Sequence, residues 1–127
     1  MTDQDQDGGR HLYAVHCIDD ASCGRKDGTP RGGSVKRMDN YPAHTEYQRV
    51  TADPQSPNFI TKLAAGPMTS DNDKWMVGSL FLVESTRKEA EEFAHNDPFF
   101  KEKVWQTINI FRYVAVGGGI KQHRGNL

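Results

Sequence analysis

The chain has 127 residues, a length that suits one domain and leaves little room for two. Its 16 basic and 17 acidic residues give a net charge of −1, so no overall field would recruit nucleic acid or an anionic membrane. No apolar run approaches the length of a transmembrane helix, and the acidic start of the chain lacks the pattern of a signal peptide. With two cysteines, the composition predicts a cytoplasmic protein with reduced thiols.

The first third of the chain contains one short strand and a long insertion. Residues 1–10 offer nothing that can be buried and are expected to form a disordered leader. A strand is predicted over 11–18, where strand-forming residues run up to Asp19. Residues 20–38 hold several glycines and basic side chains, which predicts a long, flexible, basic loop. A solvated loop and a lid over a substrate both remain open as interpretations of this insertion.

A first helix is predicted over about 40–50. Asp39 or Asn40 can cap its start, and Pro42 suits the first turn because its missing N–H costs nothing there. A second strand follows over 59–65, and Gly66-Pro67 is expected to stop it. The run 75–83 is almost wholly apolar, which is typical of a central strand covered on both faces.

The last third of the chain predicts a second helix and a last strand. Thr86 and Glu89 have the spacing of a capping box, which starts a helix over about 86–96. Asp97 ends this helix because Pro98 forces it out of helical geometry, and residues 99–103 can form one more turn. A strand is predicted over 104–116, and residues 117–127 are expected to be a flexible tail.

The order of these elements predicts the fold and the assembly. Strand, helix, strand, strand, helix, strand gives an α+β, ferredoxin-like βαββαβ subunit with a four-stranded antiparallel sheet and both helices on one face. The opposite face of the sheet carries apolar residues but has no helix to cover it. The same face of a second subunit would bury those residues, so the sequence predicts a homodimer.

His44 and Asp97 are the candidate chemical groups. In a ferredoxin-like fold, the start of the first helix and the end of the second can approach the same end of the sheet. A histidine beside a carboxylate is a proton acceptor with a fixed tautomer. The alternative is that His44 is a partly buried helix residue and Asp97 a turn residue. The cysteines and nearby histidines match no zinc spacing, and the glycine runs match no phosphate loop, so neither a metal nor a cofactor is expected.

Six segments follow one another in a characteristic order: 12–15, 42–44, Ala64-Ala65-Gly66-Pro67, 78–81, 89–94 and Asn96-Asp97-Pro98-Phe99-Phe100. Together they resemble YCII-related (YciI-like) proteins of the dimeric α/β-barrel superfamily. The YCII-like domain is then expected over 11–116, with residues 20–38 as an insertion. The resemblance implies a ferredoxin-like subunit that dimerises through its sheet, with an active-site pair at His44 and Asp97.

The resemblance also implies a reaction class. The family and its superfamily include a dehydrochlorinase of a chlorinated hydroxyquinone and muconolactone isomerase. We therefore expect a cofactor-independent lyase or isomerase that moves a proton on a small, oxygenated ring compound, chlorinated in some relatives. A small-molecule-binding or regulatory dimer without catalysis, and a purely structural dimer, remain open alternatives.

The chain departs from the family at two places that bear on ligand binding. Relatives carry arginine three residues before the histidine, where this chain has Tyr41, and they lack the long basic insertion. A basic residue of the insertion (Arg25, Arg31, Lys36 or Arg37) could replace that arginine. The residues expected to bind substrate are Asp19, Arg37, Tyr41, Gly66 and Ser79.

Overall fold

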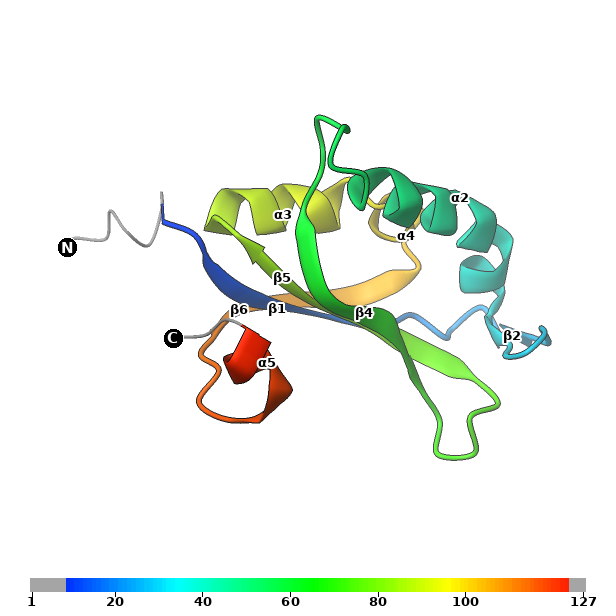
Figure 1. Cartoon of the computed structure of the whole chain (residues 1–127). Coiled ribbons are helices and arrows are strands. Elements are labelled where there is room, and N and C mark those ends of the chain that lie inside the picture. Colours follow the sequence, from blue (N-terminus) through cyan, green and yellow to red (C-terminus); the bar gives the residue numbers. More distant parts are fainter. Residues whose placement is uncertain (1–8, 124–127) are drawn as a thin grey trace.

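A four-stranded antiparallel sheet forms the middle of the molecule (Figure 1). The structure, a computed structural model, describes residues 9–123; most of the expected leader and the end of the expected tail, 124–127, lie outside these residues. The sheet has the order β4-β5-β1-β6. Its strands are β1 (His11–Asp19), β4 (Thr61–Thr69), β5 (Met76–Ser85) and β6 (Trp105–Tyr113).

The helices α2 (Val35–Thr51) and α3 (Arg87–His95) lie side by side on one face of this sheet (Figure 1). The short α4 (Pro98–Lys101) follows α3 and leads into β6. The chain order β1, α2, β4, β5, α3, β6 and the strand order together make the ferredoxin-like βαββαβ arrangement. The predicted fold class is confirmed.

The core lies between the sheet and the two helices. Alternate residues of the strands face the helices, so Val15 and Phe81, which are partners in the β1–β5 register, are both buried there. Phe93 of α3 and Phe99 of α4 close the core from above. The predicted capping box at the start of α3 is confirmed: the Thr86 hydroxyl accepts from the backbone N–H of Glu89, and the Glu89 carboxylate accepts from the N–H of Thr86.

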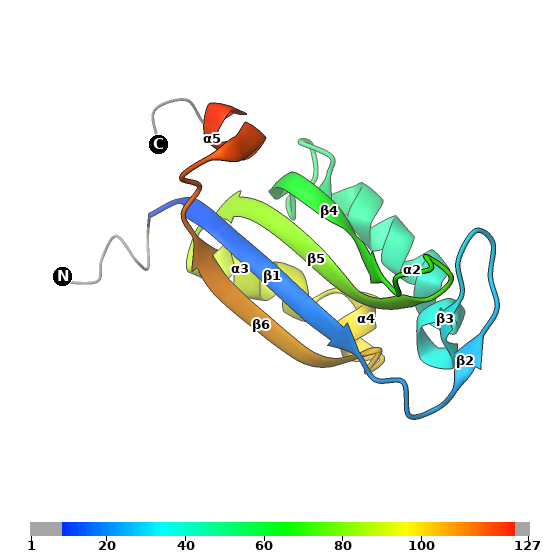
Figure 2. The same ribbon diagram turned by 90° about the horizontal axis from the view of Figure 1, so that it is seen from below.

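The opposite face of the sheet carries exposed apolar side chains and is only partly covered. The short α5 (Gly118–His123), in the segment expected to be a flexible tail, lies below one end of this face (Figure 1). There, Leu12 and Leu82 are buried together with Ala115. Elsewhere the face seen in Figure 2 is open, and its exposed apolar side chains include Ile18, Leu80, Phe111 and Tyr113.

The predicted start of the first helix is wrong: α2 begins about one turn earlier, with Ser34 as its N-cap. The Ser34 hydroxyl accepts from the backbone N–H of Arg37 at 3.1 Å, which satisfies a free donor of the first turn. The two predicted caps have other partners, since Asp39 accepts from Lys26 Nζ at 3.0 Å and Asn40 donates to the carbonyl of Lys36. Pro42 therefore lies inside the helix and not in its first turn.

The second strand also differs from the prediction, because β4 runs through Gly66 and Pro67 up to Thr69. Pro67 pairs with Ser79 of β5. A proline is compatible with this position because β4 is an edge strand, where a missing N–H need not interrupt a ladder on both sides. The last strand is shorter than predicted and ends at Tyr113.

The insertion contains a small hairpin of β2 (Arg25–Lys26) and β3 (Gly33–Ser34). It is attached to the turn between β4 and β5, since Arg31 forms an ion pair with Asp73 at 2.7 Å and the N–H of Met76 donates to the carbonyl of Gly32. Arg37, expected on the solvated loop, is buried in α2 instead. Over the described part of the chain, no helix is long and apolar enough to cross a bilayer.

Candidate functional site

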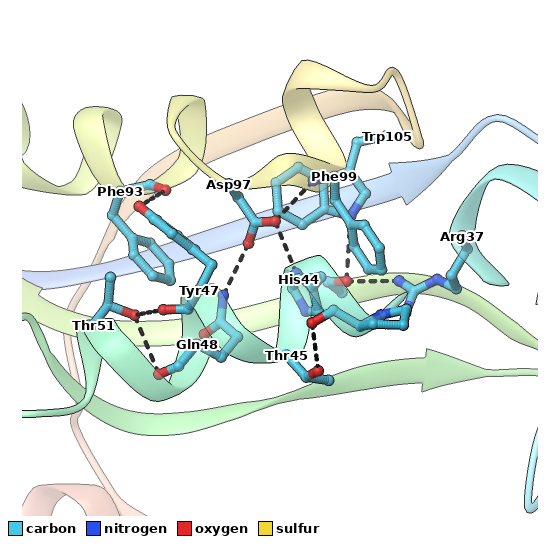
Figure 3. A network of polar contacts seen from close by, with 12 residues as sticks. Arg37, His44, Thr45, Tyr47, Gln48, Thr51, Phe93, Asp97, Phe99 and Trp105 are labelled. Carbon is cyan, nitrogen blue, oxygen red and sulfur yellow. Dashed lines mark hydrogen bonds and ion pairs between the residues drawn. The ribbon is translucent and has the colours of Figure 1, made fainter. Parts of the chain in front are cut away.

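His44 of α2 and Asp97, the residue that caps α4, are in direct contact (Figure 3). The imidazole Nδ1 lies 2.8 Å from the carboxylate Oδ1 of Asp97, across 53 residues of sequence. The His44 side chain is 10% exposed and that of Asp97 is fully buried. The contact that sequence reasoning expected is therefore present, and it is closed to bulk water on the side of the carboxylate.

The surroundings of Asp97 fix its geometry. Its oxygens accept from His44 Nδ1, from the backbone N–H of Phe99 at 2.8 Å and from Gln48 Nε2 at 2.9 Å. When the Asp97 carboxylate is ionised it can only accept, so Nδ1 then carries the proton in this contact. The other ring nitrogen, Nε2, then carries a free lone pair whenever the ring is neutral. Among residues 9–123, no group hydrogen-bonds to it.

Aromatic side chains hold the His44 ring in place. The imidazole stacks on the ring of Phe99 with centroids 3.8 Å apart and planes 1° from parallel. The Trp105 ring lies nearly perpendicular to the imidazole, with centroids 6.3 Å apart. Because the ring is restrained by stacking as well as by the Asp97 contact, its free nitrogen has a defined direction.

Arg37 forms a second buried polar centre two turns before His44 on α2. Its guanidinium bonds to Asp19 (Nε to Oδ2, 2.6 Å), to the carbonyl of Gly78 at 2.8 Å and to the hydroxyl of Ser79 at 2.7 Å. It also lies over the ring of Phe99, with Cζ 4.7 Å from the centroid. Burial raises the pKa of the Asp19 carboxyl, and the hydrogen bonds and charge of Arg37 oppose that shift. Arg37 thus links Asp19 to the aromatic ring that supports His44.

A cavity of about 480 Å³ lies between α2 and the strands β4 and β5. Five of the seven residues predicted for the site line it: Arg37, Tyr41, His44, Gly66 and Ser79. The other two, Asp19 and Asp97, do not line it, but each bonds to a residue that does. The structure therefore places all seven at or directly behind the walls of one cavity.

Sequence reasoning missed Gln48 and Lys62, which also line this cavity. Gln48 lies four residues after His44 and so shares its helix face, a spacing that could have identified it. With its amide nitrogen bound to Asp97, its oxygen is a buried acceptor without a partner among the described residues. Burial lowers the pKa of Lys62 to about 8, although the charge of Asp97 partly opposes this shift.

The cysteines take no part in the site. Cys17 is fully buried in the core, and burial raises the pKa of its thiol above the ordinary value. A thiol of this kind is a poor nucleophile, because the thiolate is the reactive form. Cys23 is exposed on the insertion and does not line the cavity.

The chain has two informative similarities to known proteins. The family model described as the YCII-related domain matches residues 12–114. Among solved structures, the chain is similar to a complex of 5-chloro-2-hydroxyhydroquinone dehydrochlorinase from Burkholderia phenoliruptrix AC1100 with 2,5-dihydroxybenzoquinone. The two sequences are 25% identical, the TM-score is 0.57, and the match covers 81% of this chain and 93% of that chain. No curated protein matches the chain significantly.

Proposed function

Because the chain belongs to the YCII-related family, matched over residues 12–114, we propose that it is a cofactor-independent lyase or isomerase. It moves a proton on a small, oxygenated ring compound bound in the cavity beside His44. The observation that carries this proposal is the contact of His44 Nδ1 with Asp97 at 2.8 Å, with the imidazole on the cavity wall. The similar structure is that of a dehydrochlorinase holding an oxygenated ring, which supports this class of substrate.

His44 acts as the base and Asp97 as its positioning group. Histidine is the side chain best suited to take up and release a proton near neutral pH. The free Nε2 accepts the proton, and the imidazolium that forms remains bonded to the Asp97 carboxylate. The stacked Phe99 ring keeps the imidazole in the orientation in which Nε2 can reach a ligand.

On a chlorinated hydroxyhydroquinone these steps amount to loss of HCl. Removal of a hydroxyl proton by His44 leaves an enolate, and return of a proton to the ring carbon that bears chlorine gives the keto form. Loss of a second hydroxyl proton then forms a carbonyl, and chloride leaves with the electron pair of the C–Cl bond. One proton and one chloride are lost in total, so no oxidant and no redox cofactor are needed.

Turnover of 5-chloro-2-hydroxyhydroquinone, measured anaerobically by chloride release, tests the proposal. We expect His44→Ala to lose about 10²–10⁴-fold in kcat with the fold intact, a typical loss for a general base. Asp97→Asn should also lose activity and shift the pH profile, because the amide no longer stabilises the imidazolium. Lys88→Met, a change on the exposed side of α3, is the control and should keep full activity.

The alternative is a small-molecule-binding dimer without catalysis. A wild-type protein that binds this ring compound tightly but releases no chloride would favour the binding module. Turnover that is unaffected in both His44→Ala and Asp97→Asn would exclude the proposed pair.

The proposal includes a homodimer joined through the open sheet face, in the cytoplasm. Four exposed apolar side chains gather on that face: Ile18, Leu80, Phe111 and Tyr113, of which Phe111 is 63% exposed. A stable interface of this kind should bury on the order of 2,000 Å². The two free cysteines are in keeping with a reducing compartment. Sedimentation at micromolar concentration should show a dimer for the wild type and a monomer for Phe111→Glu; a wild-type monomer contradicts the assembly.

A further inference from the structure

Lys62 of β4 is held against the second half of α2 with part of its ammonium group unused. Its Nζ donates to the carbonyl of Gln48 at 3.0 Å and to the hydroxyl of Thr51 at 2.8 Å. The Thr51 hydroxyl in turn donates to the carbonyl of Tyr47, so its hydrogen does not compete with the ammonium. An ammonium group has three donors. Two are used in these hydrogen bonds, and the third makes no hydrogen bond to a described residue. The ammonium also lies over the ring of Phe93, with Nζ 5.3 Å from the ring centroid, a neutral contact that leaves its charge without a carboxylate partner among residues 9–123.

The wall of the cavity has an excess of positive charge. Three basic residues line it, and no aspartate or glutamate of the described chain does. Arg37 is neutralised by its buried ion pair with Asp19 at 2.6 Å. Arg49 points to solvent, where it pairs with Glu46 at 2.6 Å. Lys62 has no such pair, so its charge is the one that a ligand in the cavity would meet.

Apart from Arg37, the basic side chains of the insertion are engaged elsewhere. Arg31 is paired with Asp73, Lys26 with Asp39, and Lys36 lies 4.0 Å from Asp20. Arg25 lies over the ring of Trp75. None of these four lines the cavity. Lys62 is therefore better placed than the insertion to supply the positive charge that an arginine before the histidine would otherwise provide.

We propose that Lys62 binds a negatively charged oxygen of the ring compound, so that the site selects substrates with an ionised ring hydroxyl. Lys62 contacts Gln48 and Thr51, which follow His44 on α2 by one and two turns, a rise of roughly 6–10 Å. One oxygenated ring with a hydrogen bond at each end bridges such a separation. Lys62 then holds the ionised oxygen while His44 faces a hydroxyl at the other end. The identification of the ligand as an oxygenated ring compound rests on the proposed function.

Burial of Lys62 supports the inference. An ammonium group loses hydration in the cavity, and this lowers its pKa to about 8. An anionic oxygen in hydrogen-bond contact would replace the lost hydration and favour the charged form. A neutral hydroxyl would stabilise the charged ammonium much less. The site should therefore bind the anionic form of a ring compound more tightly than the neutral form.

Binding measurements on the full chain test Lys62 separately from catalysis. The probes are 2,5-dihydroxybenzoquinone, which is an anion at neutral pH, hydroquinone, which is neutral, and benzoate, whose anion is a carboxylate. Lys62→Gln keeps a donor for the Gln48 carbonyl but removes the charge, and Lys62→Met removes both. Lys88→Met, on the exposed side of α3, is the matched control for the change in net charge.

We expect Lys62→Gln and Lys62→Met to weaken binding of 2,5-dihydroxybenzoquinone about 10- to 100-fold, the usual worth of a hydrogen bond to a charged group. Hydroquinone affinity should be unchanged, and Lys88→Met should behave as wild type. Equal affinity of a folded Lys62→Gln protein and the wild type for the anion overturns the inference, as does binding of benzoate alone. A wild type that binds none of the three rings instead contradicts the proposed function.

Discussion

Replacing Asp19 by asparagine removes the carboxylate that neutralises the Arg37 guanidinium. The two side chains are 3% and 1% exposed, and the shape of the pocket is retained by the substitution. A buried pair that loses one partner leaves an uncompensated charge, which costs about 3–5 kcal/mol. With an unfolding entropy of about 2.1 cal/mol/K per residue, the melting temperature should fall by roughly 10–20 °C. The free energy of unfolding of a small domain is about 5–15 kcal/mol, so the loss expected for Asp19→Asn is a large fraction of the total.

Urea denaturation at fixed protein concentration, followed by circular dichroism, measures this loss as a shift in midpoint at constant slope. The matched control is Glu46→Gln, which breaks the ion pair between Glu46 and Arg49. In this pair the Arg49 side chain is 67% exposed and that of Glu46 is 60% exposed. Water and salt screen such a pair, so the control should lose less than about 1 kcal/mol. The comparison isolates burial, because both substitutions remove one carboxylate charge next to an arginine.

The double variant Asp19→Asn/Arg37→Met separates the ion pair from the other bonds of Arg37. Since the second change removes the stranded charge, the two losses should fall short of additivity by about 1–3 kcal/mol. The carbonyl of Gly78 still loses its donor, so some cost should remain. A loss below about 1 kcal/mol for Asp19→Asn, or strictly additive losses, would refute the view that this pair is a coupled buried centre.

Three further predictions follow from individual contacts. Thr86→Ala should cost about 0.5–2 kcal/mol of unfolding free energy by urea titration, because α3 loses its N-cap; an unchanged midpoint contradicts this. Phe99→Ala should cost about 3–5 kcal/mol and also lower kcat, because Phe99 is fully buried and stacks on His44; full activity would show that the stacking is irrelevant. Affinity for 2,5-dihydroxybenzoquinone should fall as pH rises through about 8, where the partly buried Lys62 loses its charge, and a flat calorimetric profile between pH 7 and 9 speaks against it.

The elements whose signals are local were predictable from sequence. The capping box of α3 involves residues three apart, and the structure has it at the predicted place. The predicted start of α2 is wrong because Ser34, Asp39 and Asn40 can all cap a helix. Tertiary contacts favour Ser34 over Asp39 as the N-cap of α2. When the helix starts at Ser34, Arg37 lies in the helix and can bond to Asp19 and to Gly78 of β5. No pattern within 34–40 contains that information.

The edge strand shows the same limit. Gly66-Pro67 is a strong local signal to stop, yet β4 continues because its outer side pairs with no strand of the described chain. Whether a strand lies at an edge depends on the whole topology and not on its own residues. The strand order was predictable here from the sequence of helices and strands, and it could have been used to revise the reading of Pro67.

For the site, the sequence suggests His44 and Asp97 through the predicted fold and the family resemblance, while their separation of 53 residues hides the contact itself. Lys62 gave a weaker signal: it alternates with Ile60, a core residue, and so a lysine falls on the covered face of the strand. A register irregularity lies between Lys62 and Ala64, which ends simple alternation there. Its place beside α2 is therefore a property of the folded chain.

The two basic residues of the cavity wall divide between support and binding. The charge of Arg37 is neutralised by Asp19, and the guanidinium lies over the ring of Phe99. Because Phe99 stacks on the imidazole, Arg37 supports the position of His44 through this ring. Lys62 has its geometry set by neutral groups of α2, which orient the ammonium without neutralising it. A site with both features can keep its imidazole fixed in the absence of a ligand and still leave one cation to attract an anionic ring. Preorganisation and selectivity therefore rest on different residues, and substitution at one should leave the other largely intact.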